Sequence, residues 1–229
     1  MTPWQDIRAA IIDLDGTMLD TAPDFQCAIN HMRADLHLAP LDLELIKNFV
    51  GKGSENLIRQ VLAVDYDAKR VAAHFEAALA GYQRYYLHVN GKFATLYSGV
   101  QEGLAQFRSD GIELACVTNK PIAFTLPLLE RFALDAYFSV IYGGDSLPTK
   151  KPDAGPFRQV CRDFNLTPKQ VVAIGDSSND ALAARMAGCP VLTVPYGYNH
   201  GESVQKIDSD GIVGTLLDAA RLISKPAPP

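Results

Sequence analysis

Short apolar runs separated by helical patterns fill the second half of the chain. The runs lie at 112–117, 137–142, 171–174 and 191–194. Nearly continuous apolar runs of this length are typical of parallel strands that are covered on both faces. Because the runs alternate with helical patterns, the sequence predicts an α/β fold with right-handed crossovers and a doubly wound parallel sheet.

The segments between these runs carry apolar residues at the spacing of amphipathic helices. Within 157–164 the apolar side chains recur at i, i+3, i+4 and i+7, so that they form one stripe. Helices are also expected at 100–110 and 178–187, because Gly111 and Gly188 follow them and glycine commonly ends a helix.

The first half of the chain has a different pattern. An apolar run at 9–14 predicts the first strand, but the following 70 or so residues contain only helical patterns, of which 71–86 is the longest. The alternation of strands and helices resumes near Tyr97. An insert of this size is compatible with a small domain. The predicted division is a sheet domain at 1–20 and 91–229 and a helical domain at 21–90.

Composition and charge narrow the class of protein. The chain has 229 residues, of which 48% are hydrophobic, and a formal net charge of −5. Its Lys and Arg residues are scattered, whereas nonspecific nucleic-acid binding needs them clustered. No apolar run approaches the roughly 20 residues of a membrane span, and no signal-peptide pattern opens the chain. We therefore expect a cytoplasmic protein that binds neither nucleic acid nor a membrane.

The cysteines fit neither a CxxC pair nor a zinc-binding spacing. We expect them to be small buried hydrophobic residues of a reducing compartment. They are Cys27, Cys116, Cys161 and Cys189.

Two carboxylates end the first apolar run. Asp13 and Asp15 are followed by the flexible Gly16. An aspartate in this place can attack phosphorus and form an aspartyl-phosphate, and the second aspartate can protonate the leaving alcohol and then activate water. Acidic residues are also common in turns, so this pair alone favours a polar turn.

Polar residues follow two later runs in the same way. Thr118 and Asn119 can hold a phosphoryl oxygen, or they can form a turn that caps the next helix. Lys151 can neutralise a phosphate, although a surface lysine is the commoner case and Lys150 stands beside it.

A further acidic pair follows the run at 171–174. Asp176 is placed to bind Mg²⁺ through oxygen. Asp180, one helical turn later, can support Lys151 or a metal-bound water, and both carboxylates also suit a helix N-terminus. Ligands of open parallel sheets bind outside the carboxyl ends of the strands. Because all these side chains fall at that edge together, the sequence predicts a site for phosphoryl transfer.

The residues named above lie in four stretches, at 13–20, 118–119, 151–152 and 175–180. These stretches, in this order, resemble the haloacid dehalogenase superfamily of phosphatases. The most specific is 13–20, which reads Asp-Leu-Asp-Gly-Thr-Met-Leu-Asp. The resemblance covers nearly the whole chain and implies a Rossmann-like core, an inserted helical cap domain, Mg²⁺ and a phosphoaspartate intermediate. It also selects Lys151 over Lys150, because the family lysine stands directly before the proline.

Within that superfamily the chain most resembles the phosphoglycolate phosphatases, through stretches that include 20–24, 117–121 and 196–199. One departure is Ala154, where the family often carries a proline. The resemblance implies hydrolysis of a small phosphorylated metabolite, 2-phosphoglycolate.

The resemblance also implies roles for individual residues. The expected catalytic residues are Asp13, Asp15, Thr118, Asn119, Lys151 and Asp180. The expected ligands of Mg²⁺ are Asp13, Asp176 and the backbone carbonyl of Asp15. The expected substrate-binding residues are Thr17 and Lys52. Lys52 lies between two glycines in the cap loop that selects the substrate, and it is a second departure from the family pattern, which would carry another polar residue there.

Other functions share this set of residues. A sugar-phosphate phosphatase, including one acting on N-acetylmuramate 6-phosphate, and a phosphosugar mutase would keep the same core. A phosphonate hydrolase would form an imine on a cap lysine such as Lys52, and a dehalogenase would need no metal. A signalling module would be phosphorylated on Asp13 without turnover, against which Asp15 argues, since it supplies the acid and base for release. We expect a monomer or a homodimer.

Overall fold

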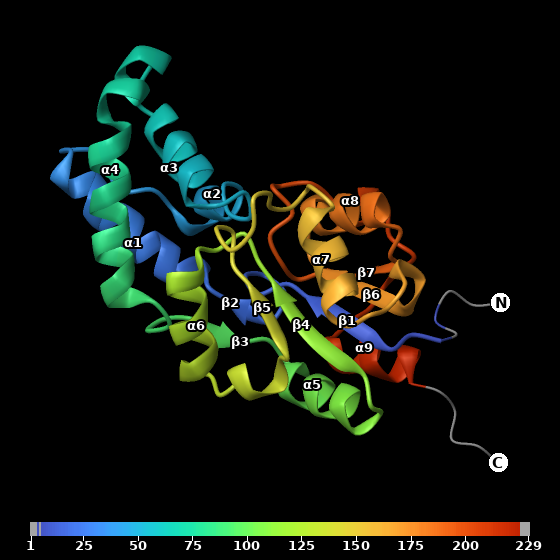
Figure 1. Cartoon of the computed structure of the whole chain (residues 1–229). Helices are drawn as coiled ribbons and strands as arrows, with labels where there is room; N and C mark the ends of the chain where they lie inside the picture. Colours follow the sequence, from blue (N-terminus) through green and yellow to red (C-terminus); the bar gives the residue numbers. More distant parts are fainter. Residues whose placement is uncertain (1–3, 5, 225–229) are drawn as a thin grey trace.

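A six-stranded parallel sheet forms the centre of the protein (Figure 1). The computed structural model describes residue 4 and residues 6–224. In spatial order the strands are β5 (Val140–Tyr142), β4 (Glu113–Val117), β1 (Ala9–Ile12), β6 (Val171–Gly175), β7 (Val191–Thr193) and β8 (Gly211–Ile212). The predicted fold class is therefore confirmed. Because β1 lies between β4 and β6, the loops that follow these three strands meet at one edge.

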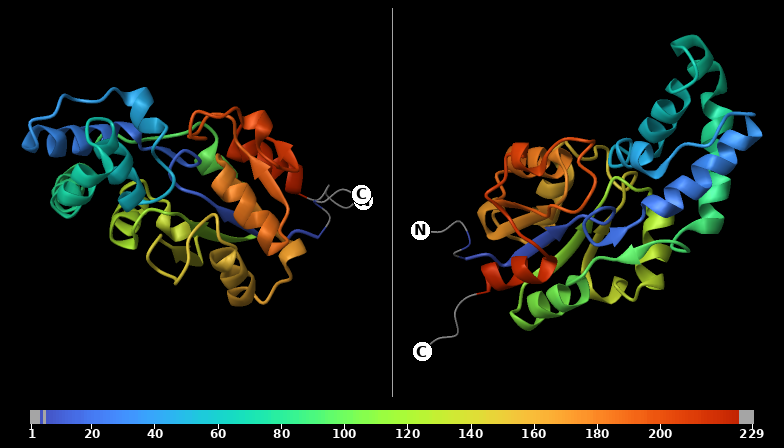
Figure 2. Two further views of the ribbon diagram at one scale, coloured as in Figure 1. Left: turned by 90° about the horizontal axis from the view of Figure 1, so that it is seen from above. Right: turned by 180° about the vertical axis from the view of Figure 1, so that it is seen from behind.

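Helices cover both faces of this sheet, as the two further views in Figure 2 show. One layer consists of α5 (Val100–Ser109), α6 (Ile122–Arg131) and α9 (Leu216–Ile223), and the other of α7 (Gly155–Asp163) and α8 (Ser178–Ala187). Alternate residues of each strand point to opposite layers. In β1, for example, Ile12 packs with the first layer and Ile11 with the second. The all-apolar runs of the sequence thus reflect burial on both faces.

Two of the predicted strands are shorter in the structure by two or three residues. The run expected at 137–142 opens with the 3₁₀ helix η1 (Asp135–Tyr137), whose turn takes the amide of Phe138, so that β5 begins only at Val140. The run at 9–14 ends as a strand at Ile12, because the carbonyl of Leu14 accepts amides of the tight loop that follows it. The remaining short helices are η2 (Pro168–Gln170) and η3 (Val204–Lys206).

The helical insert stands beside the carboxyl edge of the sheet, on the left of Figure 1. Its helices are α1 (Ala22–Asp35), α2 (Leu43–Lys47), α3 (Ser54–Ala63) and α4 (Ala68–Val89). They enclose a hydrophobic cluster of their own, to which the core contributes Phe124 and Tyr198. We refer to residues 21–90 as the cap, the boundaries predicted from the sequence.

A two-stranded antiparallel ribbon joins the cap to the core. Its strands are β2 (Leu19–Asp20) and β3 (Thr95–Leu96), which the sequence patterns did not predict. Beside it, the buried carboxylate of Asp24 accepts the amides of Gly91 at 2.6 Å and Phe93 at 2.8 Å. The two connections between cap and core are therefore tied to each other.

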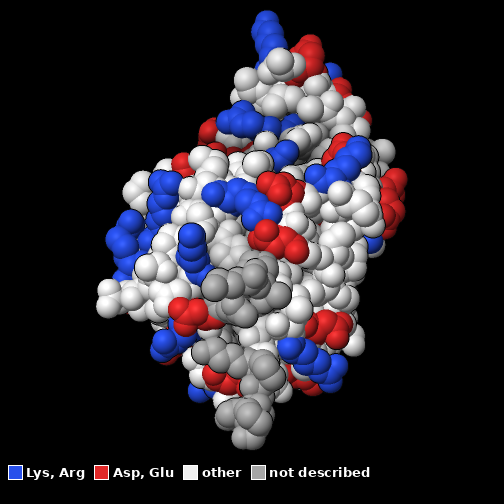
Figure 3. Space-filling model, turned by 90° about the vertical axis from the view of Figure 1, so that its right-hand side faces the viewer, with Lys and Arg blue, Asp and Glu red and all other residues white. Residues whose placement is uncertain are grey.

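The surface charges, the helices and the cysteines can be compared with what the composition predicts. On the face drawn in Figure 3, basic and acidic side chains are intermixed. Within the described residues, no helix combines the length and the apolarity that crossing a bilayer requires. The cysteines are free; Cys116, Cys161 and Cys189 are buried as expected, whereas Cys27 is only half-buried.

Candidate active site

The strand ends bring the predicted residues of the core together. Asp13 follows β1, Thr118 follows β4 and Asp176 follows β6, so that three neighbouring strands each deliver one polar side chain to the same edge. The amide of Asp13 still bonds to the carbonyl of Ile174 at 3.0 Å, and that of Thr118 to Tyr142 at 3.0 Å. The backbone of this edge is thus fixed by the sheet itself.

Lys151 lies buried between two aspartates. Its ammonium is 2.8 Å from Asp13 Oδ1 and 2.7 Å from Asp180 Oδ1, and it donates to the carbonyl of Val117 at 2.8 Å. Its neighbour Lys150 is exposed. Burial lowers the pKa of the Lys151 ammonium, but the charges of Asp13 and Asp180 outweigh it and hold the pKa above its ordinary value. Lys151 is therefore a permanent cation beside Asp13.

Asp180 is held by its own helix. Its Oδ2 accepts the hydroxyl of Ser177 at 2.8 Å in a capping box at the start of α8, and its Oδ1 accepts Lys151. Since both oxygens are occupied, the geometry makes Asp180 the residue that orients Lys151. Asp180 thus caps α8 and contacts Lys151 at the same time, and its catalytic role stays a prediction.

Asp176 is fixed from two sides. Its Oδ1 accepts the hydroxyl of the buried Thr17 at 2.7 Å, and its Oδ2 accepts the amide of Tyr198 at 2.6 Å. Gly16 has φ of +87°, and a Cβ there would lie 2.5 Å from Asp176 Oδ2. Glycine is therefore required twice over at position 16, by the backbone conformation and by the close approach of the carboxylate.

The carboxylates of Asp13, Asp176 and Asp180 each place an oxygen within 4.8 Å of the others. Burial, followed by the nearby aspartate charges, raises the pKa of Asp13 to about 7 even though Lys151 opposes the shift. Burial and the charges of Asp13 and Asp180 likewise raise the pKa of Asp176 well above its ordinary value. Three carboxylates around one ammonium leave an excess of negative charge that a divalent cation with oxygen ligands would neutralise. The residues present fit such an ion.

Asp15 points away from this cluster, toward the cap. Its Oδ1 accepts the hydroxyl of Thr21 at 2.7 Å and the ammonium of Lys120 at 2.8 Å. Lys120 is buried and also donates to the hydroxyl of Tyr86 at 2.7 Å. The sequence pattern does not single out Lys120, although this lysine stands in the stretch Thr118–Pro121. The available signal is its position two residues after Thr118 and directly before Pro121, the N-cap of α6.

A pocket lies between Asp13 and the cap. The core lines it with the two aspartates, Thr118–Pro121 and Phe124. The cap contributes residues of α1, α3 and α4 and of the loop before α3, namely Phe25, Val50, Gly51, Gly53, Ser54, Leu57, Tyr82 and Tyr86. A ligand with its phosphate at Asp13 would therefore have the rest of its structure enclosed by aromatic rings and hydroxyl groups.

Asn119 connects the cap loop to the core. Its amide group donates to the carbonyl of Gly51 at 2.9 Å and to that of Lys151 at 2.8 Å. Asn179, at the start of α8, donates to the same carbonyl of Gly51 at 3.2 Å. The cap loop is thus bonded to residues that lie directly beside Lys151 and Asp180.

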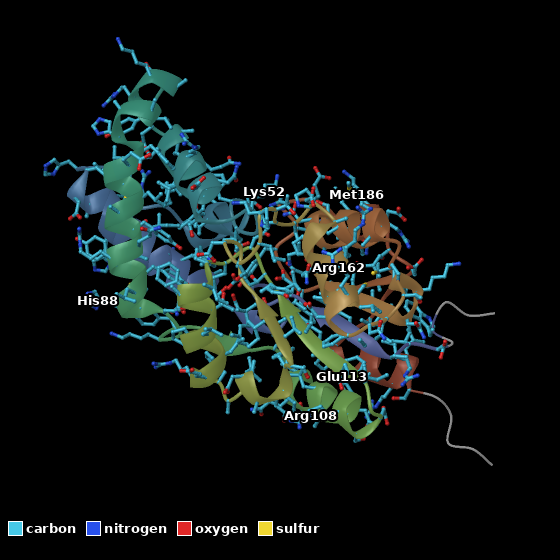
Figure 4. The ribbon with its side chains drawn as sticks, viewed as in Figure 1. Lys52, His88, Arg108, Glu113, Arg162 and Met186 are labelled. Atoms are coloured by element: carbon cyan, nitrogen blue, oxygen red, sulfur yellow. The ribbon has the colours of Figure 1, made fainter. Side chains whose placement is uncertain are left out.

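The two predicted substrate-binding residues do not line this pocket. Thr17 directs its hydroxyl at Asp176, so its contact with substrate stays a prediction. Lys52 is exposed at the junction of cap and core, where Figure 4 labels it. Its charge lies close enough to His200 to lower the pKa of that imidazole, after burial as the larger cause. Substrate binding by Lys52 also stays a prediction.

Comparison with known proteins places this site in a family. A family model described as haloacid dehalogenase-like hydrolase matches residues 10–194. This chain belongs to that family. The predicted resemblance is therefore confirmed, and the chain is an enzyme of the hydrolase class.

Relatives of known name cover almost the whole chain. A phosphoglycolate phosphatase of Nitrosospira multiformis is 47% identical over 219 residues, which are 96% of each protein. One of Thiobacillus denitrificans is 44% identical over 223 residues, again 96% of each. The crystal structure of a predicted phosphoglycolate phosphatase from Haemophilus somnus 129PT superposes with a TM-score of 0.90 at 32% identity, covering 95% of this chain and 98% of that one.

Proposed function

We propose that the protein is a Mg²⁺-dependent phosphomonoester hydrolase that converts 2-phosphoglycolate to glycolate and phosphate through an aspartyl-phosphate on Asp13. The observation that carries the proposal is the position of Asp13. It lies between the ammonium of Lys151 at 2.8 Å and the pocket that Asp15 also lines. The curated relatives that cover 96% of the chain, named as phosphoglycolate phosphatases, support the substrate.

The proposed reaction begins with attack of an Asp13 carboxylate oxygen on phosphorus. Asp15 protonates the leaving oxygen of glycolate; it suits this role because its Oδ1 is held by Thr21 and Lys120, which leaves Oδ2 for the substrate. Asp15 then takes a proton from the water that cleaves the aspartyl-phosphate. Lys151 stabilises the negative charge of the phosphoryl oxygens.

Asp13, Asp176 and the backbone carbonyl of Asp15 would hold Mg²⁺, which when bound neutralises charge between the nucleophile and the phosphate. Asp180 keeps Lys151 in place, and Thr17 keeps Asp176 in place. The cap encloses the pocket and limits access of water to it during transfer.

A panel of phosphate esters tests the proposal. With Mg²⁺ present, kcat/KM for 2-phosphoglycolate should exceed that for glucose 6-phosphate, N-acetylmuramate 6-phosphate and other sugar phosphates by at least about tenfold. A sugar phosphate as the best substrate would reject the proposed substrate but retain the hydrolase. Transfer of phosphate to a second sugar hydroxyl would identify a mutase, and stable phosphorylation without release would identify a signalling module.

A further inference from the structure

Lys120 is a buried cation in the wall of the pocket. Only 2% of its side-chain surface is exposed, yet its ammonium reaches Asp15 Oδ1 and the hydroxyl of Tyr86. The same ammonium lies 4.4 Å from the ring centre of Phe25 and 4.7 Å from that of Tyr86. One carboxylate and two aromatic faces thus compensate for removing the charge from water.

The ammonium retains an unused donor. A lysine ammonium carries three N–H groups, and in the described part of the chain that of Lys120 has two hydrogen-bond acceptors, Asp15 and Tyr86. Lys151 has more polar partners, because it donates to Asp180 and to the carbonyl of Val117 and also forms an ion pair with Asp13 Oδ1 at 2.8 Å. Of the two buried lysines, Lys120 therefore has the fewer polar partners, and it is the one that lines the pocket.

The pocket offers an anionic ligand few other partners. Among its lining residues, all of which belong to the described chain, Lys120 is the single Lys or Arg. In 2-phosphoglycolate the carboxylate carbon is two bonds from the ester oxygen. A carboxylate on so short a molecule must lie beside the acid that protonates that oxygen, and Lys120 is 2.8 Å from Asp15. Lys52, exposed and outside the lining, does not occupy such a position.

We propose that Lys120 binds the carboxylate of the substrate and thereby selects carboxylate-bearing phosphate esters. The inference rests on the proposed function and adds the residue that determines its specificity. Because one ammonium would contact both the substrate carboxylate and Asp15, binding of the carboxylate also places the leaving oxygen next to its acid.

The test compares two esters that differ at one group. In 2-hydroxyethyl phosphate a CH₂OH group replaces the carboxylate of 2-phosphoglycolate. The ratio of kcat/KM for the two esters should favour 2-phosphoglycolate in the wild-type protein. Lys120→Met should lower this ratio by about 10- to 100-fold, as expected for loss of a charged hydrogen bond. A general effect on Asp15 would lower both rates and leave the ratio unchanged.

Two further lysine variants complete the design. Lys150→Met, at an exposed lysine outside the pocket lining, should keep the wild-type ratio within about twofold. Lys52→Met should also keep the wild-type ratio. If the ratio instead falls in Lys52→Met and is retained in Lys120→Met, the carboxylate binds to the cap loop and the inference is overturned. Where Lys120→Met does not fold, Lys120→Gln retains an N–H donor for Asp15 without the charge, and the same fall in the ratio is expected.

Failure of the inference is distinguishable from failure of the proposed function. A wild-type ratio near one would overturn both, because the enzyme would then not select the carboxylate at all. A wild-type ratio well above one that persists in Lys120→Met and Lys120→Gln would overturn the inference alone and leave 2-phosphoglycolate as the substrate.

Discussion

The two sides of the pocket are built from different chemistry. On the core side, buried charges from the ends of β1 and β6 and from the loop after β5 are held by ion pairs and helix caps, as Lys151 and Asp180 are. On the cap side, aromatic and hydroxyl groups such as Tyr82, Tyr86 and Ser54 project from helices. In the proposed reaction the core side contacts the phosphate, which all candidate substrates share, whereas the cap side and Lys120 contact the rest of the substrate.

The largest effect is expected at the centre of the core side. Asp13→Asn removes the proposed nucleophile and should lower kcat by at least about 10⁴-fold, equivalent to roughly 5 kcal/mol. Because it also relieves repulsion among buried carboxylates, the variant should remain folded. Steady-state kinetics and circular dichroism check both statements. Activity within tenfold of wild type would remove Asp13 from the role of nucleophile.

The next effect concerns the buried ion pair. Lys151→Met leaves Asp13 and Asp180 without their common cation and should lower the free energy of unfolding by about 3–5 kcal/mol. The adjacent, exposed Lys150→Met should change it by no more than about 0.5 kcal/mol. Urea denaturation of both variants measures the difference. Equal stabilities would mean that the ion pair contributes little and that the core side is not organised by charge.

The pH dependence of stability follows from the raised pKa of Asp13. The folded protein holds a proton on Asp13 up to about pH 7, whereas the unfolded chain releases it near 3.8. Without metal, this group's stabilising contribution is fully present below pH 4 and is lost as pH rises to 7, with a slope of up to about 1.4 kcal/mol per pH unit.

The contribution of Asp13 can be isolated by urea denaturation of the wild-type protein and Asp13→Asn in EDTA, from pH 5 to pH 8. All other groups titrate in both proteins, so the difference between the two pH profiles reports Asp13. The free energy of unfolding should fall less steeply with rising pH in Asp13→Asn than in the wild-type protein. Mg²⁺ should stabilise the wild-type protein more at pH 8 than at pH 5, because protons compete for the same carboxylates. Identical pH profiles of the two proteins would contradict the assigned charge balance.

The smallest effect is expected on the cap side. Tyr86→Phe removes the hydroxyl that accepts from Lys120 and should destabilise the protein by roughly 1–2 kcal/mol. The hydroxyl of the neighbouring Tyr85 bonds to Asp35 in an exposed position, so Tyr85→Phe should cost under about 0.5 kcal/mol. Thermal unfolding distinguishes the pair. A larger loss in Tyr85→Phe would show that the Lys120–Tyr86 contact is not the important one.

The difference between the two sides also explains what the sequence could predict. The core residues stand directly after apolar runs, and parallel strands bring their carboxyl ends to one edge, so that the sequence alone predicts that Asp13, Thr118 and Asp176 lie together. Tyr82 and Tyr86 instead recur at i and i+4 on a helix, the spacing of ordinary core packing, and nothing in that spacing indicates that they face a ligand.

The remaining differences between the sequence-based predictions and the structure have local causes. Lys120 was overlooked because its burial depends on Asp15 and Tyr86, which are 105 and 34 residues away in the chain. The ribbon of β2 and β3 has only two residues in each strand, too few for a detectable alternation. The start of β5 was misplaced because the turn at η1 uses apolar residues that fit a strand equally well.

In the proposed reaction Asp13 carries the phosphoryl group during turnover. The direct measurement is rapid acid quenching of the enzyme with saturating 2-phosphoglycolate and Mg²⁺, followed by borohydride reduction and mass spectrometry of the peptide that contains residues 9–20. We expect conversion of Asp13 to homoserine, the reduction product of an aspartyl-phosphate, and its absence without substrate. Reduction at another residue, or an unmodified Asp13 in the midst of turnover, would contradict the account.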